Sequence, residues 1–310
     1  GWVRMDGKVY TDVDAAIVFF ALPCGPLGIL GRLLREIPYI VSLRGADVPG
    51  NEPSLDVWHT VLKPLRRLVL KHAAAVVTPS RSLRQIAADC DGIRAACIPN
   101  GVDTALFRPA DARPDGRRVL SVGRFHSQKN LFFLLEQMDI LSREMGRPFD
   151  LHLAGDGPLG AALKAFARGL KIGERIAWHG WCDRREVRRR YHEADCLVST
   201  SSYEAMPNVI LEAMACALPV VAPDVGGSAE LVRHGQTGFL VNLNRPATLR
   251  QAVRRLIEDP RLAARMGRNG RQVVEAHYSW DRVAAAFLDV LNGPGSVRSD
   301  DNDGSPKRPG

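Results

Sequence analysis

The chain lacks several features that would assign it to common protein classes. No apolar run approaches the roughly 20 residues of a membrane-spanning helix, and no secretory signal is visible at residue 1. Six cysteines are scattered without a close-spaced framework, which argues against a disulfide scaffold and favours reduced thiols in a cytoplasmic protein. Aromatic residues are also scarce, at 6% of the chain, and only Trp181 and Tyr191 flank the arginine-rich run at 184–190, too few for a platform that stacks nucleic-acid bases.

The remaining composition is that of an ordinary soluble protein. With 310 residues, of which 45% are hydrophobic and 25% charged, the chain is long enough for about two domains with a sizeable core. The formal net charge of +8 favours anionic partners, for which a phosphorylated ligand or an acidic membrane face would both qualify.

Strand-like and helix-like segments alternate from end to end, the pattern of doubly wound α/β sheets. A polar stretch at 108–117 is expected to be a linker, and a second strand–helix series runs from 118 to about 259. In the first part, strands are expected at 15–20, 39–43, 74–78 and 96–98, and helices at 27–36, 55–71 and 80–88. Helices at 262–276 and 280–291 are expected to close the fold.

Two carboxylates eight positions apart, Glu204 and Glu212, carry the most informative local signal. They bracket Pro207, between a strand-like segment and a run of good helix formers. Proline fits the first turn of a helix, so Glu204 is expected in the preceding loop and Glu212 in the second turn. The first-turn amides near Asn208 and Val209 would then form an anion site, flanked by carboxylates that accept hydrogen bonds from hydroxyl groups. Taken alone, these nine residues fit a plain helix start equally well.

Glycine-rich loops follow three other strand candidates. In the first, Gly123 lets backbone approach a ligand, and Arg124 and Lys129 project at the mouth of a parallel sheet, where α/β proteins bind ligands. Two cations there could neutralise a diphosphate, arginine as a planar fork and lysine as a point charge. Such loops at four successive strand ends are difficult to explain as turns alone. The other two loops contain Gly155-Asp156-Gly157 and Gly226-Gly227…Glu230.

Together these segments resemble the C-terminal half of the retaining, nucleotide-sugar-dependent glycosyltransferases of family four, which have the GT-B fold. The matching stretch runs from the segment at 98–103 to that at 235–241. The resemblance implies an α/β protein with two Rossmann-like, doubly wound parallel-sheet domains that face a cleft. The implied divisions are a partial acceptor-side domain at 1–107, a donor-binding domain at 108–276, a helix at 277–292 packing back on the first domain, and a disordered tail at 293–310.

The resemblance also implies roles for individual residues. Arg124 and Lys129 would hold the donor diphosphate, Glu204 would contact the donor hexose, and Glu212 the ribose. No metal or other cofactor is expected, because cations and helix amides would stabilise the leaving group. The expected catalytic residues are therefore Arg124, Lys129 and Glu204, and the expected donor-binding residues are Gly123, Gly155, Asp156, Gly157, Pro207, Asn208, Val209 and Glu212.

The match is poor in the first domain. Relatives usually have considerably more chain before the segment at 98–103, and this sequence enters partway through that domain, as expected for a fragment or for a naturally short enzyme. Where the family often has a histidine before glycine on the acceptor side, this chain has Arg44, with Asp47 three residues later. Arg44 is a permanent cation, so it would grip an acidic acceptor instead of acting as an imidazole does. The alternative is a loop ion pair between Arg44 and Asp47.

Three other patterns are more typical of structure than of chemistry. The segments 179–182 and 192–196 have spacings similar to zinc sites, but the second joins a basic helix to an apolar strand. The segments 12–14 and 89–91 imitate an Asp-X-Asp metal motif, although the first is expected to cap a strand and the second to close a helix. The arginine-rich run at 184–190 could bind nucleic acid, but a solvated helix face is favoured. No nucleic-acid partner is therefore expected.

The sequence predicts transfer of a hexosyl group from a UDP- or GDP-sugar to a hydroxyl of a glycan or lipid-linked acceptor, with retention of configuration. The product would be a glycan, polysaccharide or glycolipid. No side chain stands out as a covalent nucleophile, so front-face displacement is expected. Two alternatives remain: a catalytically inactive nucleotide-sugar-binding fragment, and another GT-B enzyme such as a sugar phosphorylase or epimerase.

A basic amphipathic helix is predicted at 57–71. Apolar residues recur there at helical spacing, and Lys63, Arg66, Arg67 and Lys71 fall on the opposite side. Such a helix can lie on anionic lipid, which predicts peripheral contact with the inner membrane face. The alternative is that the apolar face is buried in the domain core.

Overall fold

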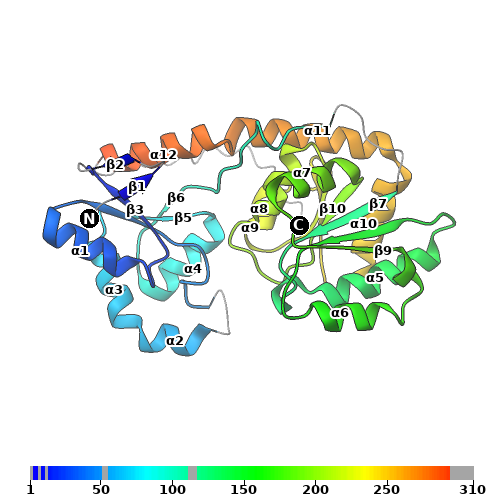
Figure 1. Ribbon diagram of the computed structural model, residues 1–310, viewed down its shortest axis with the longest axis horizontal. Coiled ribbons are helices and arrows are strands. Elements are labelled where there is room, and N and C mark those ends of the chain that lie inside the picture. Colours follow the sequence, from blue (N-terminus) through cyan, green and yellow to red (C-terminus); the bar gives the residue numbers. More distant parts are fainter. Residues whose placement is uncertain (1–2, 6–7, 11–12, 51–54, 111–116, 294–310) are drawn as a thin grey trace, which may run out of the picture.

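The structure, a computed structural model, describes the chain apart from residues 1–2, 6–7, 11–12, 51–54, 111–116 and 294–310 (Figure 1). Nearly all of the expected tail, much of the expected linker, and Asp12 of the first Asp-X-Asp pattern lie outside the described residues. Strands β1 (Val3–Met5) and β2 (Lys8–Tyr10) form an antiparallel hairpin.

A parallel four-stranded sheet, in the order β3-β4-β5-β6, forms the first domain. Its strands are Ala16–Phe19, Tyr39–Ser42, Ala75–Thr78 and Ala96–Cys97. The connecting helices are α1 (Gly25–Arg35), α2 (Asp56–Val61), α3 (Lys63–His72) and α4 (Arg81–Asp91). Central strand β4 is buried along its whole length, as expected for a parallel strand covered on both faces.

A parallel six-stranded sheet, in the order β12-β11-β10-β7-β8-β9, forms the second domain. Its strands, in chain order from β7, are Arg118–Val122, Asp150–Ala154, Ile176–Gly180, Cys196–Val198, Val220–Pro223 and Gly238–Val241. Helices and 3₁₀ turns connect the strands in the order η2 (Ser127–Lys129), α5 (Leu131–Glu144), α6 (Gly160–Ala167), η3 (Lys171–Arg175), α7 (Arg184–Glu193), α8 (Asn208–Ala215) and α9 (Gly226–Leu231). Helix α10 (Pro246–Glu258) follows the last strand. The expected doubly wound α/β architecture is confirmed.

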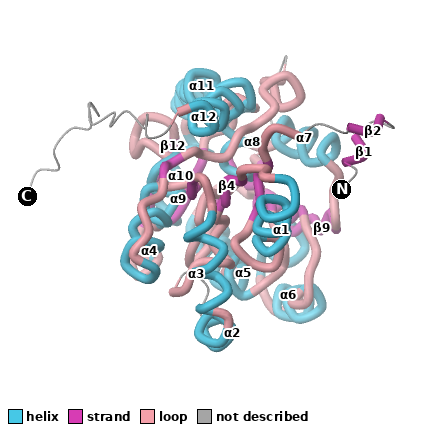
Figure 2. Tube along the Cα trace, turned by 90° about the vertical axis from the view of Figure 1, so that its left-hand side faces the viewer, coloured by secondary structure: helices cyan, strands magenta, loops and turns pink. Residues whose placement is uncertain are grey.

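Two long C-terminal helices join the domains. Helix α11 (Pro260–His277) lies along the second domain, and α12 (Trp280–Asn292) continues across the first (Figure 1). Viewed from the side, the two helices lie together over the same side of the molecule (Figure 2). Val283 and Phe287 of α12 pack with Ile40, Val77 and Ile98 of the first domain, so the end of the described chain completes the core around its first sheet.

The helix expected at 55–71 is in fact two helices, so that prediction is wrong. The chain breaks at Leu62, between α2 and α3, because Pro64 lies in the first turn of α3 and has no N–H group to continue a helix. The prediction that Arg66 lies on an outer cationic face is also wrong, since its side chain is only 2% exposed.

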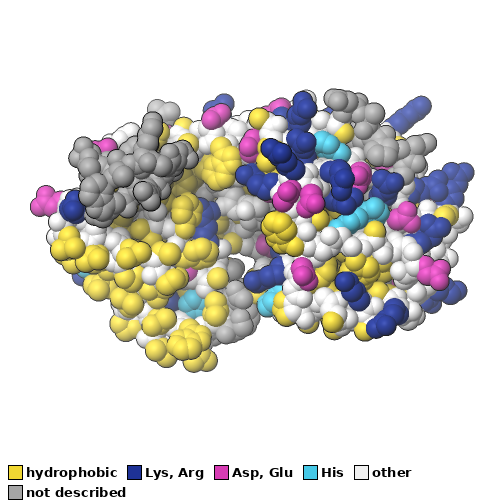
Figure 3. All heavy atoms as spheres, viewed as in Figure 1, with side chains coloured by type: hydrophobic (Ala, Val, Ile, Leu, Met, Phe, Trp, Pro, Cys, Tyr) yellow, Lys and Arg dark blue, Asp and Glu magenta, His cyan; other side chains and the backbone are white. Residues whose placement is uncertain are grey.

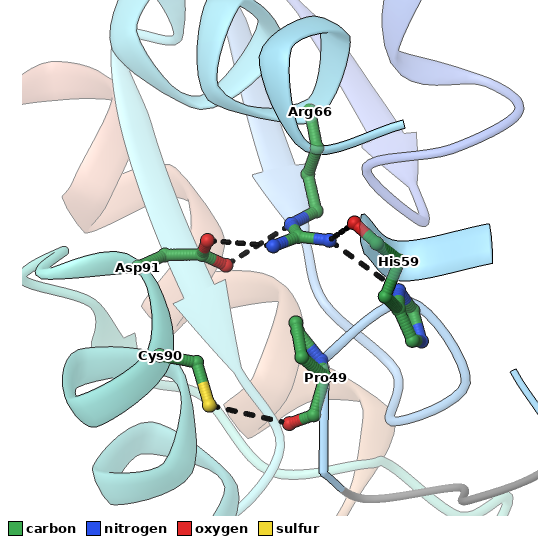
Figure 4. Close-up of polar contacts among 5 residues, drawn as sticks. All are labelled: Pro49, His59, Arg66, Cys90 and Asp91. Atoms are coloured by element: carbon green, nitrogen blue, oxygen red, sulfur yellow. Dashed lines mark hydrogen bonds and ion pairs between the residues drawn. The ribbon is translucent and has the colours of Figure 1, made fainter. Parts of the chain in front are cut away.

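Arg66 instead forms a buried ion pair with Asp91, the last residue of α4 (Figure 4). Its Nε and Nη2 groups donate to the two carboxylate oxygens at 3.0 and 2.7 Å, and Nη1 donates to the carbonyl oxygen of His59 at 3.3 Å. Beside the pair, Cys90 donates to the carbonyl oxygen of Pro49 at 3.4 Å. The Asp-X-Asp pattern at 89–91 thus closes a helix, as expected, and ties α3 to α4.

The apolar side of α2 and α3 is divided: the core buries Val69 and Leu70, as the alternative expected, whereas the other apolar residues of these helices are exposed. Trp58 is 62% exposed, and α1 adds a further apolar stripe alongside. Figure 3 shows hydrophobic side chains gathered over this part of the first domain. Among the described residues, no helix has the length and hydrophobicity needed to cross a membrane. The exposed apolar residues are Val57, Trp58, Val61, Leu62, Leu65 and Leu68 of α2 and α3, and Leu27, Leu30, Leu33 and Leu34 of α1.

Candidate functional site

The order of strands in the second sheet creates a topological switch point between β7 and β10. From β7 the chain winds outward through β8 and β9, then returns to the other side of β7 as β10. Open α/β sheets bind ligands outside the carboxyl ends of their strands at such a point. A small pocket lies there, lined by Gly123, Lys129, Ser199 and Thr200 among others.

Hydrogen bonds lock the loops after β7 and β10 into one unit. Thr200 donates its hydroxyl to the carbonyl oxygen of Lys129 at 2.8 Å. Gln128 donates its side-chain amide to the carbonyl oxygen of Tyr203 at 2.9 Å and accepts from the N–H group of Ser202 at 2.9 Å. The two predicted catalytic loops therefore hold a fixed relative position.

Lys129 and Glu204 meet in an ion pair at this junction. Their side chains are only 20% and 10% exposed, so the pair is partly withdrawn from water, where charge interactions are stronger. Arg124 lies on the same loop with an exposed side chain that meets no partner among the described residues. The structure thus brings Lys129 and Glu204 together and leaves Arg124 accessible beside them.

The predicted glycines are explained by loop packing. Gly155 and Gly157 have φ values of 147° and 157°, which disfavour other residues. A Cβ atom on Gly155 would lie 1.9 Å from the carbonyl oxygen of Gly123, and one on Gly157 would lie 2.7 Å from that of Phe125. Asp156 strengthens this arrangement, because its carbonyl oxygen accepts from the N–H group of Phe125 at 2.8 Å. Donor contacts by these residues stay a prediction.

Helix α8 begins one residue later than expected. Pro207 is its N-cap, with ψ of 111°, and Asn208 is the first helical residue. The N–H groups of Ile210 and Leu211 point to the carbonyl oxygen of Pro207, whereas those of Asn208 and Val209 have no acceptor within the helix. These two amides are therefore free in the way that the predicted anion site requires, and anion binding there stays a prediction.

Glu212 lies in the second turn of α8, as expected, and has a partner that the sequence did not reveal. One of its oxygens accepts a hydrogen bond from the Tyr191 hydroxyl at 3.0 Å. Burial raises the pKa of Glu212, and the Tyr191 hydrogen bond opposes that rise. The carboxylate is thus held in one orientation by the buried tyrosine of α7.

Arg44 and Asp47, the two residues predicted on the acceptor side, have different structural roles. Asp47 is buried, and its two oxygens accept from the N–H groups of Arg44, Gly45 and Ala21 at 2.7 to 3.1 Å. The Asp47 carboxylate therefore shapes the loop by binding backbone N–H groups, and the alternative of a side-chain ion pair between Arg44 and Asp47 is not formed. The Arg44 guanidinium lies 4.6 Å from the centre of the Phe19 ring and donates to the side chain of Asn100.

Two residues that bridge the domains were not predicted as site residues. Asn100, in the segment that leaves the first sheet, bonds to Arg44 and to the start of α8. Glu230 of α9 accepts at 2.9 Å from the N–H groups of both Arg81 and Ser82, so it caps α4 of the other domain. Both lie in segments that carried the family resemblance, but sequence spacing gives no sign of such distant partners.

The other patterns have structural partners. His192 contacts the carbonyl oxygen of Arg108 at 2.7 Å, and His179 contacts His152 at 3.0 Å. Burial and nearby Arg190 lower the pKa of His179 to about 4, so its ring is neutral at physiological pH. No three metal-binding side chains cluster within the described residues. The arginine run is only partly solvated, since Arg190 is ion-paired with Glu193.

Comparison with known families gives two matches that cover both domains. Residues 103–273 match the family model of glycosyl transferases group 1, and residues 8–106 match that of glycosyltransferase family 4. Alpha-D-kanosaminyltransferase of Streptomyces kanamyceticus is 35% identical over 84% of this chain and 73% of its own length. A GDP-mannose-dependent alpha-(1-6)-phosphatidylinositol monomannoside mannosyltransferase of Mycolicibacterium smegmatis is 29% identical over 94% of this chain and 80% of its own length.

Solved structures agree with these matches. Sucrose-phosphate synthase of Thermosynechococcus elongatus superposes with a TM-score of 0.77 at 25% identity, over 90% of this chain and 73% of its own. Anabaena HepE in complex with UDP and glucose gives a TM-score of 0.77 at 20% identity, over 89% and 77% of the two chains, and supports the fold alone. The chain belongs to glycosyltransferase family four, a family of nucleotide-sugar-dependent enzymes, and has the GT-B fold.

Proposed function

We propose that this protein transfers a hexosyl group from a UDP- or GDP-sugar to an acceptor hydroxyl, with retention of the anomeric configuration. The observation that carries the proposal is the Lys129–Glu204 ion pair at the switch point of the second sheet, with Glu204 in the loop that leads into α8 and its free first-turn amides. Cations and free amides there suit a diphosphate, and a carboxylate beside them suits sugar hydroxyls.

Stabilisation of the leaving group is the main contribution expected from this site. When the bond between the anomeric carbon and the phosphate oxygen breaks, its electron pair and the developing negative charge pass to the diphosphate. Lys129, held by its ion pair, and the free amides of Asn208 and Val209 would be preorganised donors for that charge, and the exposed Arg124 would add a second cation. Glu204, held by Lys129, would orient the hexose for the incoming acceptor.

Retention follows from attack on the same face as the leaving group. The acceptor oxygen bonds to the anomeric carbon as the phosphate departs, and the acceptor proton passes to an oxygen of the departing diphosphate. This route needs no protein nucleophile. The side of the first domain that carries Arg44 would bind the acceptor, which we propose is a glycan or a lipid-linked glycan.

A nucleotide-sugar panel tests the proposal. The protein is incubated with UDP-glucose, UDP-N-acetylglucosamine and GDP-mannose, and release of UDP or GDP is followed with the thermal shift that each compound produces. Slow release without added phosphate, together with stabilisation by one nucleotide, is expected. Stabilisation without release would indicate an inactive binding protein, and turnover that requires free phosphate would indicate a phosphorylase.

Replacing Glu212 with glutamine is expected to weaken UDP or GDP binding by about tenfold or more, the scale of a lost hydrogen bond to a charged group. Because burial raises the pKa of Glu212, its carboxylate takes up a proton at a higher pH than an exposed glutamate does. As the pH is lowered, the affinity of the parent for the nucleotide should therefore begin to fall at a higher pH than it would with an exposed glutamate. The nucleotide phosphate titrates as well, so the relevant quantity is the difference between parent and variant. Isothermal titration across pH measures it, with exposed Glu258→Gln as control; equal affinities of parent and Glu212→Gln would remove the ribose assignment.

We also propose that the exposed side of α2 and α3 docks on anionic lipid. Its apolar stripe, with Trp58 at 62% exposure, lies beside Lys63, Arg67 and Lys71. A stripe of this composition lies at a lipid interface, and each cation near an anionic surface contributes about 1 kcal/mol. Arg66 does not take part, since it is buried. Docking would bring the enzyme to a lipid-linked acceptor.

Vesicle co-sedimentation tests the docking. Binding to phosphatidylglycerol vesicles at low salt is expected, with loss at high salt and no binding to phosphatidylcholine vesicles. Trp58→Ser should reduce binding about tenfold, whereas Trp181→Ser, which changes a still more exposed tryptophan of the other domain, should leave it unchanged. Equal loss in both variants, or self-association in place of vesicle binding, would contradict the proposal.

A further inference from the structure

A single asparagine, Asn100, touches both halves of the proposed active site. It lies where the chain passes from β6 toward the second domain, next to Gly101. That segment is held in place by Trp280, because a Cβ atom on Gly101 would lie only 2.7 Å from the indole ring. The position of Asn100 is therefore set by the junction of the domains.

The three hydrogen bonds of the Asn100 side chain are all directed at the two half-sites. Its carbonyl oxygen accepts from the Arg44 guanidinium on the first-domain side. Its amide group donates to the side-chain oxygen of Asn208 at 2.8 Å and to the carbonyl oxygen of Met206 at 3.1 Å. Asparagine combines one acceptor with two donors, so neither aspartate nor leucine can make the same three contacts.

The contacts on the second-domain side fix the anion site of α8. Met206 precedes the N-cap Pro207, so holding its carbonyl oxygen sets the direction of the Asn208 and Val209 amides. Because the side-chain oxygen of Asn208 is occupied by Asn100, its NH₂ group is left to donate elsewhere. A displaced turn would misalign these donors with a bound phosphate.

We propose that Asn100 is a positioning residue that couples the Arg44 side of the cleft to the phosphate-binding turn of α8. This inference rests on the proposed donor site. Arg44 and Asn208 are joined through Asn100, so a change at one is transmitted to the other by this side chain. A merely structural role for Asn100 would affect stability without making Arg44 and Asn208 interdependent.

A mutant cycle measured by UDP and GDP titration tests the coupling. Arg44→Met, Asn208→Ala and the double variant are prepared in the parent and in Asn100→Leu. In the parent background, the fold-change in Kd of the double variant should differ by at least about threefold from the product of the two single fold-changes. In the Asn100→Leu background, the fold-change of the double variant should equal that product. Asn100→Leu should itself weaken nucleotide binding about tenfold, while Asn269→Leu, which loses an exposed side-chain bond to Gln236, should not.

Asn100→Asp keeps the experiment decisive if the leucine variant fails to fold. Aspartate keeps an acceptor for Arg44 but cannot donate to Asn208 or Met206, so we expect a folded protein with weakened nucleotide binding and no remaining interdependence of Arg44 and Asn208. Independent effects in the parent, or unchanged interdependence in the Asn100 variants, would overturn the coupling alone. A parent that binds neither UDP nor GDP would overturn the donor site and this inference with it.

Discussion

Replacing Lys129 with alanine is expected to lower turnover about a hundredfold or more, the scale of losing one preorganised group that stabilises developing charge. Lys129 lies at the switch point, partly withdrawn from water, and its ammonium group already holds Glu204. The substitution would therefore remove a cation from the proposed diphosphate site and release Glu204, the carboxylate proposed to orient the hexose. Steady-state kinetics with the donor identified from the panel measures the effect, which should fall mainly on kcat.

The exposed Lys171 provides a matched control, since its alanine variant removes the same charge far from the switch point. Glu204→Gln should also impair turnover more than nucleotide binding, and Arg124→Ala should resemble Lys129→Ala if both cations contact the diphosphate. Turnover of Lys129→Ala and Arg124→Ala within about threefold of the parent would rule out the diphosphate role.

Arg66→Ala is expected to destabilise the protein by about 3–5 kcal/mol, the cost of leaving one partner of a buried ion pair uncompensated. Asp91 is only 3% exposed and receives two hydrogen bonds from Arg66 (Figure 4). Without the guanidinium, this buried carboxylate would have no other ion-pair partner among the residues that the structure describes. Urea unfolding followed by circular dichroism measures the loss as a lower midpoint.

Arg67 is the natural control, because it is adjacent in α3 but exposed. Its alanine variant should change stability by no more than about 0.5 kcal/mol. The double variant Arg66→Met/Asp91→Leu should recover most of the loss, because a buried ion pair can be replaced by packed apolar side chains at little net cost. A loss in Arg66→Ala no larger than in Arg67→Ala would show that the buried pair contributes little.

The strand–helix alternation and the loops at strand ends could be predicted from sequence because they depend on short-range patterns. The strands expected at 39–43 and 74–78 are found at Tyr39–Ser42 and Ala75–Thr78, and Glu212 lies in the second turn of α8 as expected. The errors lie where the same local sequence pattern is compatible with two structures. Leu62 ends one helix because Pro64 follows closely, and the helical spacing that placed Arg66 with the outer cations could not reveal Asp91 as a partner from another helix.

The parts of the site that could not be predicted depend on contacts between distant segments. Asp47 was expected beside an acceptor, but its oxygens serve three backbone N–H groups because the loop folds around it. Asn100 and Glu230 act across the domain boundary, where sequence separation carries no geometric information. Sequence therefore located the groups suited to a diphosphate, while the structure revealed what holds them in place.

The position of α12 has a consequence for how this protein is made. Strands β4 and β5 are synthesised early, yet the face that carries Ile40 and Val77 is covered by Val283 and Phe287, near the end of the described chain. On the ribosome, that face stays open while the whole second domain is translated, and it offers apolar surface to chaperones or to neighbouring nascent chains during that interval. The core of the first domain can therefore be completed only after the second domain has been synthesised.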